Sequence, residues 1–328
     1  MRHKAKHCLK RIGLVCALAA LWLTPSGQAQ NEPHILFVGN SFTFGATSAV
    51  RHYEAATVHD LNGTAIGGVP ALFRRMSEEA GLSYDVSLET IGGADLAKHW
   101  REKRPLIDRH WDIVVLQSYS ILDSRAPGDP ASLVAAVRII AEALRQHNPH
   151  VAIYLTATWP RADLVYAKPS PWLGKPIEVM TTDIAKGYDE ARIAAEHATV
   201  LPVGEAFLHA MREGVADSDP YDGIAYNKVD LWGWDHYHAS THGYYLEALV
   251  AFGAITGRDP RELGAGEKCA DDLGLSPEQA AALQRIAAET LWREANHLTP
   301  MTLHEGRTLP PVAAGEHEGT RNMAPAHP

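Results

Sequence analysis

Short, continuous apolar runs recur along the 328-residue chain, and segments with helical periodicity separate them. Such runs are typical of strands that are buried on both faces. Their alternation with helices predicts an α/β fold, in which a mainly parallel sheet has helices on both faces. The expected strands are residues 35–38, 84–91, 112–117, 151–157 and 200–203. The expected helices are residues 69–80, 129–147, 177–197, 238–257 and 277–297, with one more that contains Leu96, His99 and Trp100.

The first 29 residues have the pattern of a secretory signal peptide. Five Lys and Arg residues come before residue 12, residues 12–23 are almost wholly apolar, and a small polar stretch ends at Ala29. The apolar run is too short to span a bilayer comfortably, so we expect cleavage after Ala29 rather than a membrane anchor. The sequence therefore predicts a secreted or periplasmic protein with no stable membrane insertion after the signal is removed.

Charge and cysteine content limit the classes of partner and fold. The chain has 30 basic and 39 acidic residues, and loss of residues 1–29, which hold five of the basic ones, leaves a net charge of −14. An acidic exported protein is poorly suited to bind nucleic acid. Of the three cysteines only Cys269 would remain, so no disulfide within the chain is expected.

Residues 30–300 are expected to form one domain, because no change of composition marks a second one. Residues 45–68 lack clear periodicity and are expected to be an irregular insertion that lines or covers a binding site. Residues 160–176 and 214–234 are expected to be loops. Residues 301–328 are rich in Gly, Pro, Glu and His without periodicity, which predicts a disordered tail.

The first apolar run ends in Gly39-Asn40-Ser41, which places a serine directly after a predicted central strand. Ligands of parallel α/β sheets bind outside the carboxyl ends of the strands. Ser41 could therefore present its hydroxyl as a nucleophile and its backbone N–H to an oxyanion. The alternative is that Ser41 caps a following helix, a common use of serine after a strand.

A second group of reactive side chains lies in residues 234–243. Asp235 and His238 have the spacing D-x-x-H, which within one turn can bring a carboxylate against Nδ1 of the imidazole and leave Nε2 free to act as a base for Ser41. The same stretch could instead ligate zinc through Asp235, His236, His238 and His242. It lacks the H-E-x-x-H spacing of a helical zinc site, and solvated histidines without a role are a third possibility.

Two further strand ends carry candidate donors for an oxyanion hole. Gly92 and Gly93 follow the second strand, where the absence of Cβ lets a backbone N–H approach a substrate closely. Gln117 ends the third strand, where its amide could donate. A turn at the start of a helix and a hydrogen bond to a loop are the structural alternatives for these residues.

Tryptophans near the predicted strand ends could form a surface on which a sugar or an apolar acyl group stacks. Trp159, Trp232 and Trp234 are the candidates, although buried tryptophans usually serve packing alone. His99 could line the site or cap its helix.

At these residues the sequence resembles the SGNH (GDSL-type) serine hydrolases, through Gly39-Asn40-Ser41 as first block and Asp235-x-x-His238 as last. Residues 39–43, Gly-Asn-Ser-Phe-Thr, resemble one subgroup of that family. The resemblance covers residues 35–257. It implies a three-layer α/β/α sandwich of flavodoxin-like order with about five parallel strands, and ester hydrolysis without a cofactor.

Position by position, the resemblance implies Ser41 as nucleophile, His238 as general base and acid, and Asp235 as the carboxylate that orients it. Gly93, with Gly92 as alternative, would be an oxyanion donor beside the Ser41 N–H. The family usually places asparagine where Gln117 stands, so Gln117 is a donor by position only. The Gly-x-Ser-x-Gly elbow of α/β-hydrolases is absent around Ser41, which argues against that fold.

The resulting hypothesis is an exported serine esterase that hydrolyses carboxylic esters through an acyl-enzyme, with O-acetyl esters on carbohydrates as preferred substrates. Its partners would be small-molecule or carbohydrate esters, and no metal or cofactor is expected. Asn40, Trp159 and Trp234 are assigned to substrate binding. Two alternatives stay open: a metal-dependent hydrolase that uses the histidine cluster, and a non-catalytic glycan-binding module on the same fold.

Overall fold

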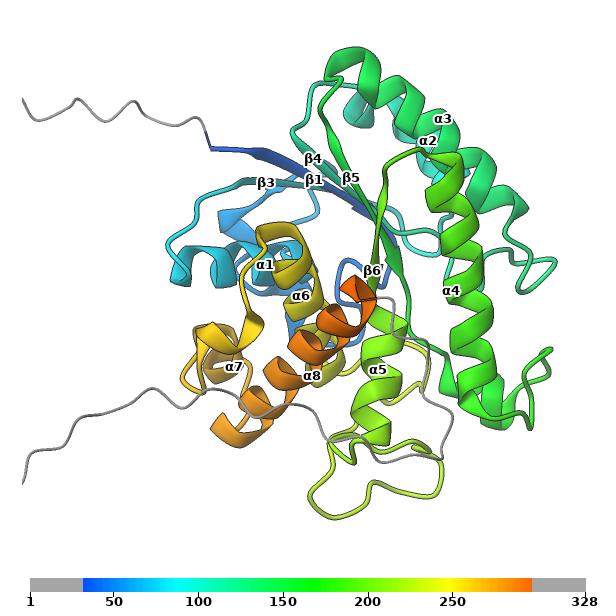
Figure 1. The fold of residues 1–328 in the computed structure, drawn as a ribbon, viewed down its shortest axis with the longest axis vertical. Coiled ribbons are helices and arrows are strands. Elements are labelled where there is room, and N and C mark those ends of the chain that lie inside the picture. The colour runs from blue at the N-terminus through cyan, green and yellow to red at the C-terminus, as the bar shows by residue number, and fades with distance from the viewer. Residues whose placement is uncertain (1–31, 297–328) are drawn as a thin grey trace, which may run out of the picture. The chain divides into compact units, whose positions relative to one another are not determined.

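A six-stranded sheet between two layers of helices forms the centre of residues 32–296, the part of the chain that the structure, a computed structural model, describes (Figure 1). Every neighbouring pair of strands is parallel, and the order is β2-β3-β1-β4-β5-β6. This confirms the predicted parallel α/β fold, with six strands instead of about five. The strands are β1 (His34–Gly39), β2 (His59–Asp60), β3 (Asp85–Thr90), β4 (Ile113–Leu116), β5 (Ala152–Ala157) and β6 (Thr199–Pro202).

Helices cover both faces of the sheet, which explains why the central strands are apolar throughout rather than alternating. One layer holds α2 (Leu96–Ile107), α3 (Ala131–His147) and α4 (Ile177–Ala194), drawn in cyan and green (Figure 1). The other holds α1 (Gly68–Glu79), α5 (Val203–Arg212), α6 (Thr241–Thr256), α7 (Lys268–Asp272) and α8 (Pro277–Ala295). Short 3-10 turns occupy Ala49–His52, Ala55–Thr57 and Pro260–Leu263, and a π-helical turn occupies Asp163–Ala167.

The position of β1 determines where a ligand can bind. After β1 the chain adds β2 and β3 on one side of it, and then β4, β5 and β6 on the other. The carboxyl end of β1 is thus the point where the winding of the sheet changes direction, and a crevice opens at such a point in doubly wound folds. The residue pairs Gly39 with Thr90 and Val38 with Leu116 bring the ends of β3 and β4 beside it.

Several elements differ from the sequence prediction. The irregular insertion 45–68 contains β2, an edge strand of two residues that pairs with β3, and two 3-10 turns. Helix α5 was not predicted, because Gly204 suggested the end of a strand. Gly204 instead permits close packing: a Cβ there would lie 2.7 Å from the carbonyl oxygen of Thr158. Helix α6 begins at Thr241, capped by Ser240, so His238 lies in the loop before it.

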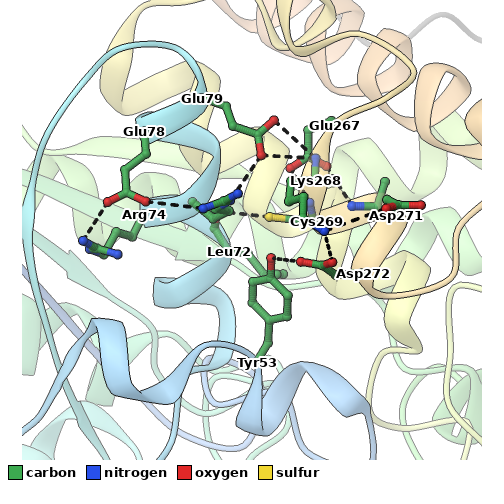
Figure 2. A network of polar contacts seen from close by, with 12 residues as sticks. Tyr53, Leu72, Arg74, Glu78, Glu79, Glu267, Lys268, Cys269, Asp271 and Asp272 are labelled. Carbon is green, nitrogen blue, oxygen red and sulfur yellow. Dashed lines mark hydrogen bonds and ion pairs between the residues drawn. The ribbon is translucent and has the colours of Figure 1, made fainter.

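A polar network fastens α7 to α1 and to the 3-10 turn near Tyr53 (Figure 2). The hydroxyl of Tyr53 donates to Asp272 at 3.1 Å, and both carboxylate oxygens of Glu79 accept the N–H of Lys268 at 3.2 Å. Glu267 caps α7 by accepting the N–H groups of Cys269 and Ala270. The Cys269 thiol is fully buried under these contacts, and burial raises its pKa.

None of the helices within residues 32–296 combines the length and apolar character needed to cross a membrane. The predicted signal peptide (1–29) and the predicted tail (301–328) lie outside the described residues.

Candidate active site

Ser41 lies in a tight turn that follows β1, at the switch point of the sheet. Its carbonyl oxygen accepts the N–H of Ala46 at 3.0 Å and the hydroxyl of Tyr244 at 3.2 Å, which fixes the backbone of the turn from two sides. No helix begins at Ser41: the next helical turn starts at Ala49 and is capped by Ser48. The helix-cap interpretation of Ser41 is therefore wrong.

Asn40 joins the turn to both neighbouring strand ends. Its Nδ2 donates to the carbonyl oxygens of Ala94 at 2.9 Å and Ser118 at 3.1 Å, and its Oδ1 accepts the N–H of Phe42 at 3.1 Å. The side chain is buried, and both amide hydrogens are used. The assignment of Asn40 to substrate binding is corrected accordingly: its amide holds three loops together instead of facing a ligand.

Gln117 serves the same turn from β4. Its Oε1 accepts the N–H of Asn40 at 2.8 Å and the hydroxyl of Thr43 at 3.1 Å, and its Nε2 donates to the carbonyl oxygen of Ser118. Gly39 leaves room for this arrangement, because a Cβ there would lie only 2.0 Å from the Thr43 hydroxyl oxygen. Oε1 of Gln117 thus holds the scaffold and one Nε2 hydrogen is used on Ser118, while the role of third oxyanion donor stays a prediction by position.

Asp235 and His238 meet within one turn, as the D-x-x-H spacing predicts. Oδ2 of the carboxylate lies 2.6 Å from Nδ1 of the imidazole, and Oδ1 accepts the N–H groups of His238 at 2.9 Å and Tyr237 at 3.1 Å. Burial alone would raise the pKa of Asp235, but these hydrogen bonds hold it below its ordinary value. A carboxylate fixed in this way orients the imidazole and leaves Nε2 without a hydrogen bond to any of residues 32–296.

Aromatic packing holds the His238 loop against the Ser41 turn. The ring of Phe42, the residue after Ser41, stacks on Trp159 with 4.0 Å between centroids and 3° between planes. The edge of the same ring faces His238 at 5.8 Å, and the ring of Tyr237 at 5.4 Å. The serine and the imidazole are therefore on neighbouring, rigidly packed segments. Ser41 and His238 share no side-chain hydrogen bond here, as is often so for catalytic pairs before substrate binds.

The turn after β3 supplies backbone donors next to Ser41. Gly92 and Gly93 are exposed, and Gly93 has φ +66°, a conformation that glycine adopts without strain. The turn is tied to β1 because Ile91 donates to the carbonyl oxygen of Gly39 at 3.1 Å. Within the described part of the chain, the N–H groups of Ser41 and Gly93 bind no acceptor. Neither N–H group is occupied within the fold, and their role as oxyanion donors stays a prediction.

The three tryptophans divide into two kinds. Trp159 and Trp232 are buried: Trp159 is stacked between Phe42 and Phe207, and Trp232 donates to the carbonyl oxygen of Pro160. The assignment of Trp159 to substrate binding is thus wrong, since no face of the ring is available. Trp234, directly before Asp235, is 80% exposed and could contact a substrate.

The histidine cluster does not converge on one point. The ring of His236 lies 4.4 Å from Tyr221, His242 interacts with Gln279 and Asp230, and His238 is paired with Asp235. Across residues 32–296, no group of three or more His, Cys, Asp or Glu side chains is arranged to hold a metal ion. The alternative zinc site of Asp235, His236, His238 and His242 is not formed by this arrangement.

His99 neither lines the site nor caps its helix. It is fully buried, with Nδ1 2.6 Å from Oε2 of the equally buried Glu89, while Asp95 caps α2 through the N–H of Lys98. The sequence did not indicate this pair, because Glu89 lies within a strand and no local spacing links the two residues.

Tyr237 packs beside the base, although no sequence pattern indicated it. Its ring contacts those of Phe42 and His238, and the guanidinium carbon of Arg161 lies 3.7 Å from its centroid. Arg161 in turn makes two hydrogen bonds to Asp163, at 3.0 and 2.8 Å. The D-x-x-H spacing places Tyr237 beside the base, but it does not tell which way the ring points.

The fold and these strand-end residues define a doubly wound α/β protein with a Ser, Asp and His group at the switch point. No protein-family model matches the chain, and no curated protein matches it. A DUF4886 family protein from Bacteroides uniformis has a similar solved structure, with TM-score 0.56 and 18% identity over 80% of this chain and 96% of that one. This likeness shows a shared fold.

Two further solved structures have lower TM-scores. A protein described as a GDSL-like lipase, from Parabacteroides merdae, has TM-score 0.46 and 16% identity over 69% of this chain and 96% of that one. A family two carbohydrate esterase from Clostridium thermocellum, solved with cellohexaose, has TM-score 0.40 and 12% identity over 69% and 64%.

Proposed function

We propose that the chain is a serine esterase of the SGNH type. The observation that carries this proposal is the local Asp235–His238 pair, with 2.6 Å between carboxylate and Nδ1, on a loop packed against the turn of Ser41. Ser41 lies almost two hundred residues before this pair in the sequence, and the contact of Phe42 with His238 beside the carboxyl end of β1 supports a common site, since parallel α/β sheets bind ligands at such strand ends.

The reaction follows from the roles of the three side chains. Nε2 of His238 accepts the proton of the Ser41 hydroxyl as Oγ bonds to the ester carbonyl carbon, and Asp235 stabilises the imidazolium that forms. The carbonyl oxygen becomes an oxyanion, which the N–H groups of Ser41 and Gly93 stabilise. The bond to the alcohol then breaks, and the imidazolium gives its proton to the departing alcohol. Water, deprotonated by His238, releases the acid and restores Ser41.

O-Acetyl esters on carbohydrates are the substrates that we propose. Trp234 exposes its indole beside Asp235, and aromatic rings at such places stack on the faces of sugars. Export after cleavage of residues 1–29 would bring the protein to an environment where glycans occur. Acetylated oligosaccharides should therefore be turned over faster than p-nitrophenyl esters of long-chain acids, and Trp234→Ala should raise KM for the oligosaccharide while leaving that for p-nitrophenyl acetate unchanged.

Replacement of Ser41 tests the proposal directly. Ser41→Ala should abolish hydrolysis of p-nitrophenyl acetate and labelling by a fluorophosphonate probe without lowering the melting temperature. Ser132→Ala, at a partly exposed position on α3, is the matched control and should change neither. Activity that survives Ser41→Ala but is lost on exhaustive chelation would favour a metal hydrolase. Failure of the probe to label wild-type Ser41 would favour a glycan-binding module.

A further inference from the structure

A buried acid–base pair joins the two elements that flank the turn of Gly93. Glu89 is the last residue but one of β3, and His99 lies in the first turn of α2. Both side chains are fully shielded from solvent, with 2.6 Å between Oε2 of Glu89 and Nδ1 of His99. A carboxylate oxygen only accepts, so Nδ1 carries the hydrogen. The proposed reaction uses neither of these side chains.

The pair closes a short loop around Gly93. Between its two partners lie residues 90–98, and the turn that carries the Gly93 N–H is near the middle of this stretch. One hydrogen bond across the base of the loop sets the distance between the end of β3 and the start of α2. Gly93 itself is not packed, because a Cβ there would meet no atom within 4 Å. Its position therefore depends on how the two flanks of the loop are held.

Other hydrogen bonds connect the same loop to the neighbouring strand ends. The carbonyl oxygen of Ala94 accepts Nδ2 of Asn40 at 2.9 Å, and the N–H of Leu96 donates to Oγ of Ser118 at 3.3 Å. Both are hydrogen bonds between neutral groups. The buried pair is shorter and includes a carboxylate, and charge-assisted hydrogen bonds are roughly twice as strong as neutral ones. It is thus the strongest of these restraints on the loop.

Stability alone does not explain a buried pair of this kind. Both groups lose their hydration, and apolar side chains of similar size are often as stabilising as a buried ion pair, or more so. Nε2 of His99 has no hydrogen-bond partner among residues 32–296, so Glu89 is the one hydrogen-bond partner of the ring there. A hydrogen bond has a defined direction, which apolar packing lacks. A defined direction is what an oxyanion hole requires of the elements that carry its donors.

We propose that Glu89 and His99 form a positioning pair, which holds the Gly93 N–H where the oxyanion develops on the ester carbon attacked by Ser41. The pair touches no reacting atom and acts only through the loop between its partners. Since the oxyanion exists only in the transition state, a misplaced donor lowers kcat and leaves KM nearly unchanged. This inference rests on the proposed esterase function and adds to it the two residues that support Gly93.

The double variant Glu89→Met/His99→Leu removes the hydrogen bond without leaving an unpaired buried charge. Misplacement of a catalytic group by about 1 Å can cost about 10²-fold in rate. We expect kcat for p-nitrophenyl acetate to fall by about 10–10²-fold, with KM changed by less than about threefold. A boronic acid inhibitor, which forms a tetrahedral adduct on Ser41, should lose affinity by a similar factor.

A conservative variant separates positioning from packing. His99→Asn places an amide donor near the position of Nδ1 and keeps the hydrogen bond to Glu89, although asparagine fills less space than histidine. Its kcat should lie within about fivefold of wild type, well above that of the double variant. If the pair served packing alone, His99→Asn would be no better than the double variant, and that result would overturn the proposal.

A second histidine–carboxylate pair provides the matched control. Nε2 of His147 lies 2.9 Å from Oδ1 of Asp108. Asp108 follows α2 and His147 ends α3, so both lie at the amino-terminal edge of the sheet, opposite to Ser41. Asp108→Leu/His147→Leu removes this pair and should leave kcat, KM and inhibitor affinity unchanged.

Gly93→Ala tests whether the pair acts through Gly93. Alanine is strained at φ +66°, so this change displaces the donor by itself. Adding Glu89→Met/His99→Leu to Gly93→Ala should lower kcat by less than about threefold more, because the two changes disturb the same group. Full additivity of the two effects would contradict action through Gly93.

The outcomes distinguish the two proposals. Wild-type kcat in Glu89→Met/His99→Leu, together with an inactive Ser41→Ala variant, overturns the role of the pair and leaves the esterase proposal intact. Activity in Ser41→Ala overturns both. If the double variant fails to fold, Glu89→Gln keeps the shape of the pair and replaces the charge-assisted hydrogen bond by a neutral one of about half the strength. An unchanged kcat in that protein would refute positioning by Glu89 and His99.

Discussion

The side-chain Oε1 of Gln117 lies 2.8 Å from the backbone nitrogen of Asn40, so the residue that follows β4 fixes the turn that follows β1. Asn40 makes the reciprocal contact through its own amide, which donates to the carbonyl oxygen of Ser118. The two amides connect neighbouring strand ends at the place where Ser41 must be held. Under the proposed esterase function, this arrangement preorganises Ser41 as the nucleophile.

Loss of the Gln117 side chain should destabilise the protein. Gln117→Ala leaves the buried N–H of Asn40 without its acceptor, and an unpaired buried backbone group costs about 1–3 kcal/mol. The free energy of unfolding from urea titration should fall by that amount. Gln146→Ala on the exposed side of α3 is the control and should change it by less than about 0.5 kcal/mol. An unaltered urea midpoint for Gln117→Ala would show that the contact has no such role.

Asp235→Asn should nearly abolish activity while the protein stays folded. An amide at this position cannot stabilise the imidazolium and favours the wrong tautomer of His238, a change that costs about 10⁴-fold in kcat in a serine hydrolase of the triad type. The kcat for p-nitrophenyl acetate should fall by about 10³–10⁴-fold. Asp222→Asn, in the exposed loop nearby, is the comparison and should retain full turnover. Activity in Asp235→Asn within tenfold of wild type would contradict the triad.

The same carboxylate should contribute to stability in a defined pH range. Hydrogen bonds hold the folded-state pKa of Asp235 below its ordinary value of 3.8, so its contribution is present above about pH 4 and is lost as the pH falls through the lowered value. Melting temperatures of wild type and Asp235→Asn should therefore converge when the pH is lowered from 6 to 3. A difference between the two melting temperatures that stays constant or grows as the pH is lowered would contradict a stabilising role of the Asp235 carboxylate.

The strands and the Asp235–His238 pair could be predicted from local features of the sequence. The roles of side chains that make contacts between distant segments could not. The strands after which Ser41 and Gly92 lie were predictable because both faces of the sheet are covered, and the Asp235–His238 pair was predictable because it forms within one turn. Spacing cannot show what a side chain faces across the fold. The amides of Asn40 and Gln117, predicted to meet substrate, meet backbone groups of other loops.

The burial and orientation of other side chains were also not predictable from the sequence, because they depend on contacts between distant segments. Trp159 and Trp234 both lie near predicted strand ends in the sequence. In the fold, Trp159 stacks on Phe207 and is buried, whereas Trp234 is exposed to solvent. Strand β2 was not predicted because two residues carry no periodicity. Tyr237 was overlooked because its orientation depends on Arg161, which lies in a different loop.

Glu205 should make the stability depend on pH in the opposite direction from Asp235. It lies in the first turn of α5 with Oε2 buried and unpaired, and burial raises its pKa to about 7 from an ordinary 4.5. The folded protein keeps this carboxyl protonated to a higher pH than the unfolded chain does. The contribution of Glu205 to the free energy of unfolding is therefore complete below about pH 4.5 and is lost as the pH rises toward 7. In urea titrations over that pH range, the free energy of unfolding of wild type should fall by up to about 3 kcal/mol relative to that of Glu205→Gln.

Glu190→Gln on the exposed side of α4 is the matched control for Glu205→Gln and should track wild type at every pH. Parallel curves for wild type and Glu205→Gln would show that the Glu205 carboxyl is not held protonated in the folded state.

Cys269 should react only when α7 opens. The thiol is buried and its pKa is raised by burial, so little thiolate is available in the folded protein (Figure 2). Glu267→Ala removes the cap of α7 and should speed alkylation of Cys269 by iodoacetamide about tenfold, read by mass spectrometry of the Cys269 peptide. Asp271→Ala, whose side chain is 80% exposed on the same helix, should leave the rate unchanged. Equal rates in both variants would contradict capping by Glu267.

The edges of the sheet have a consequence for self-association. Strand β2 pairs only two residues with β3, and β6, the strand at the other edge, ends at Pro202, which has no N–H to donate. Short strands and proline at an edge give a second copy of the chain little backbone to pair with. Growth of the sheet from molecule to molecule is thereby discouraged, although its inner strands are apolar enough to form fibres if they were exposed.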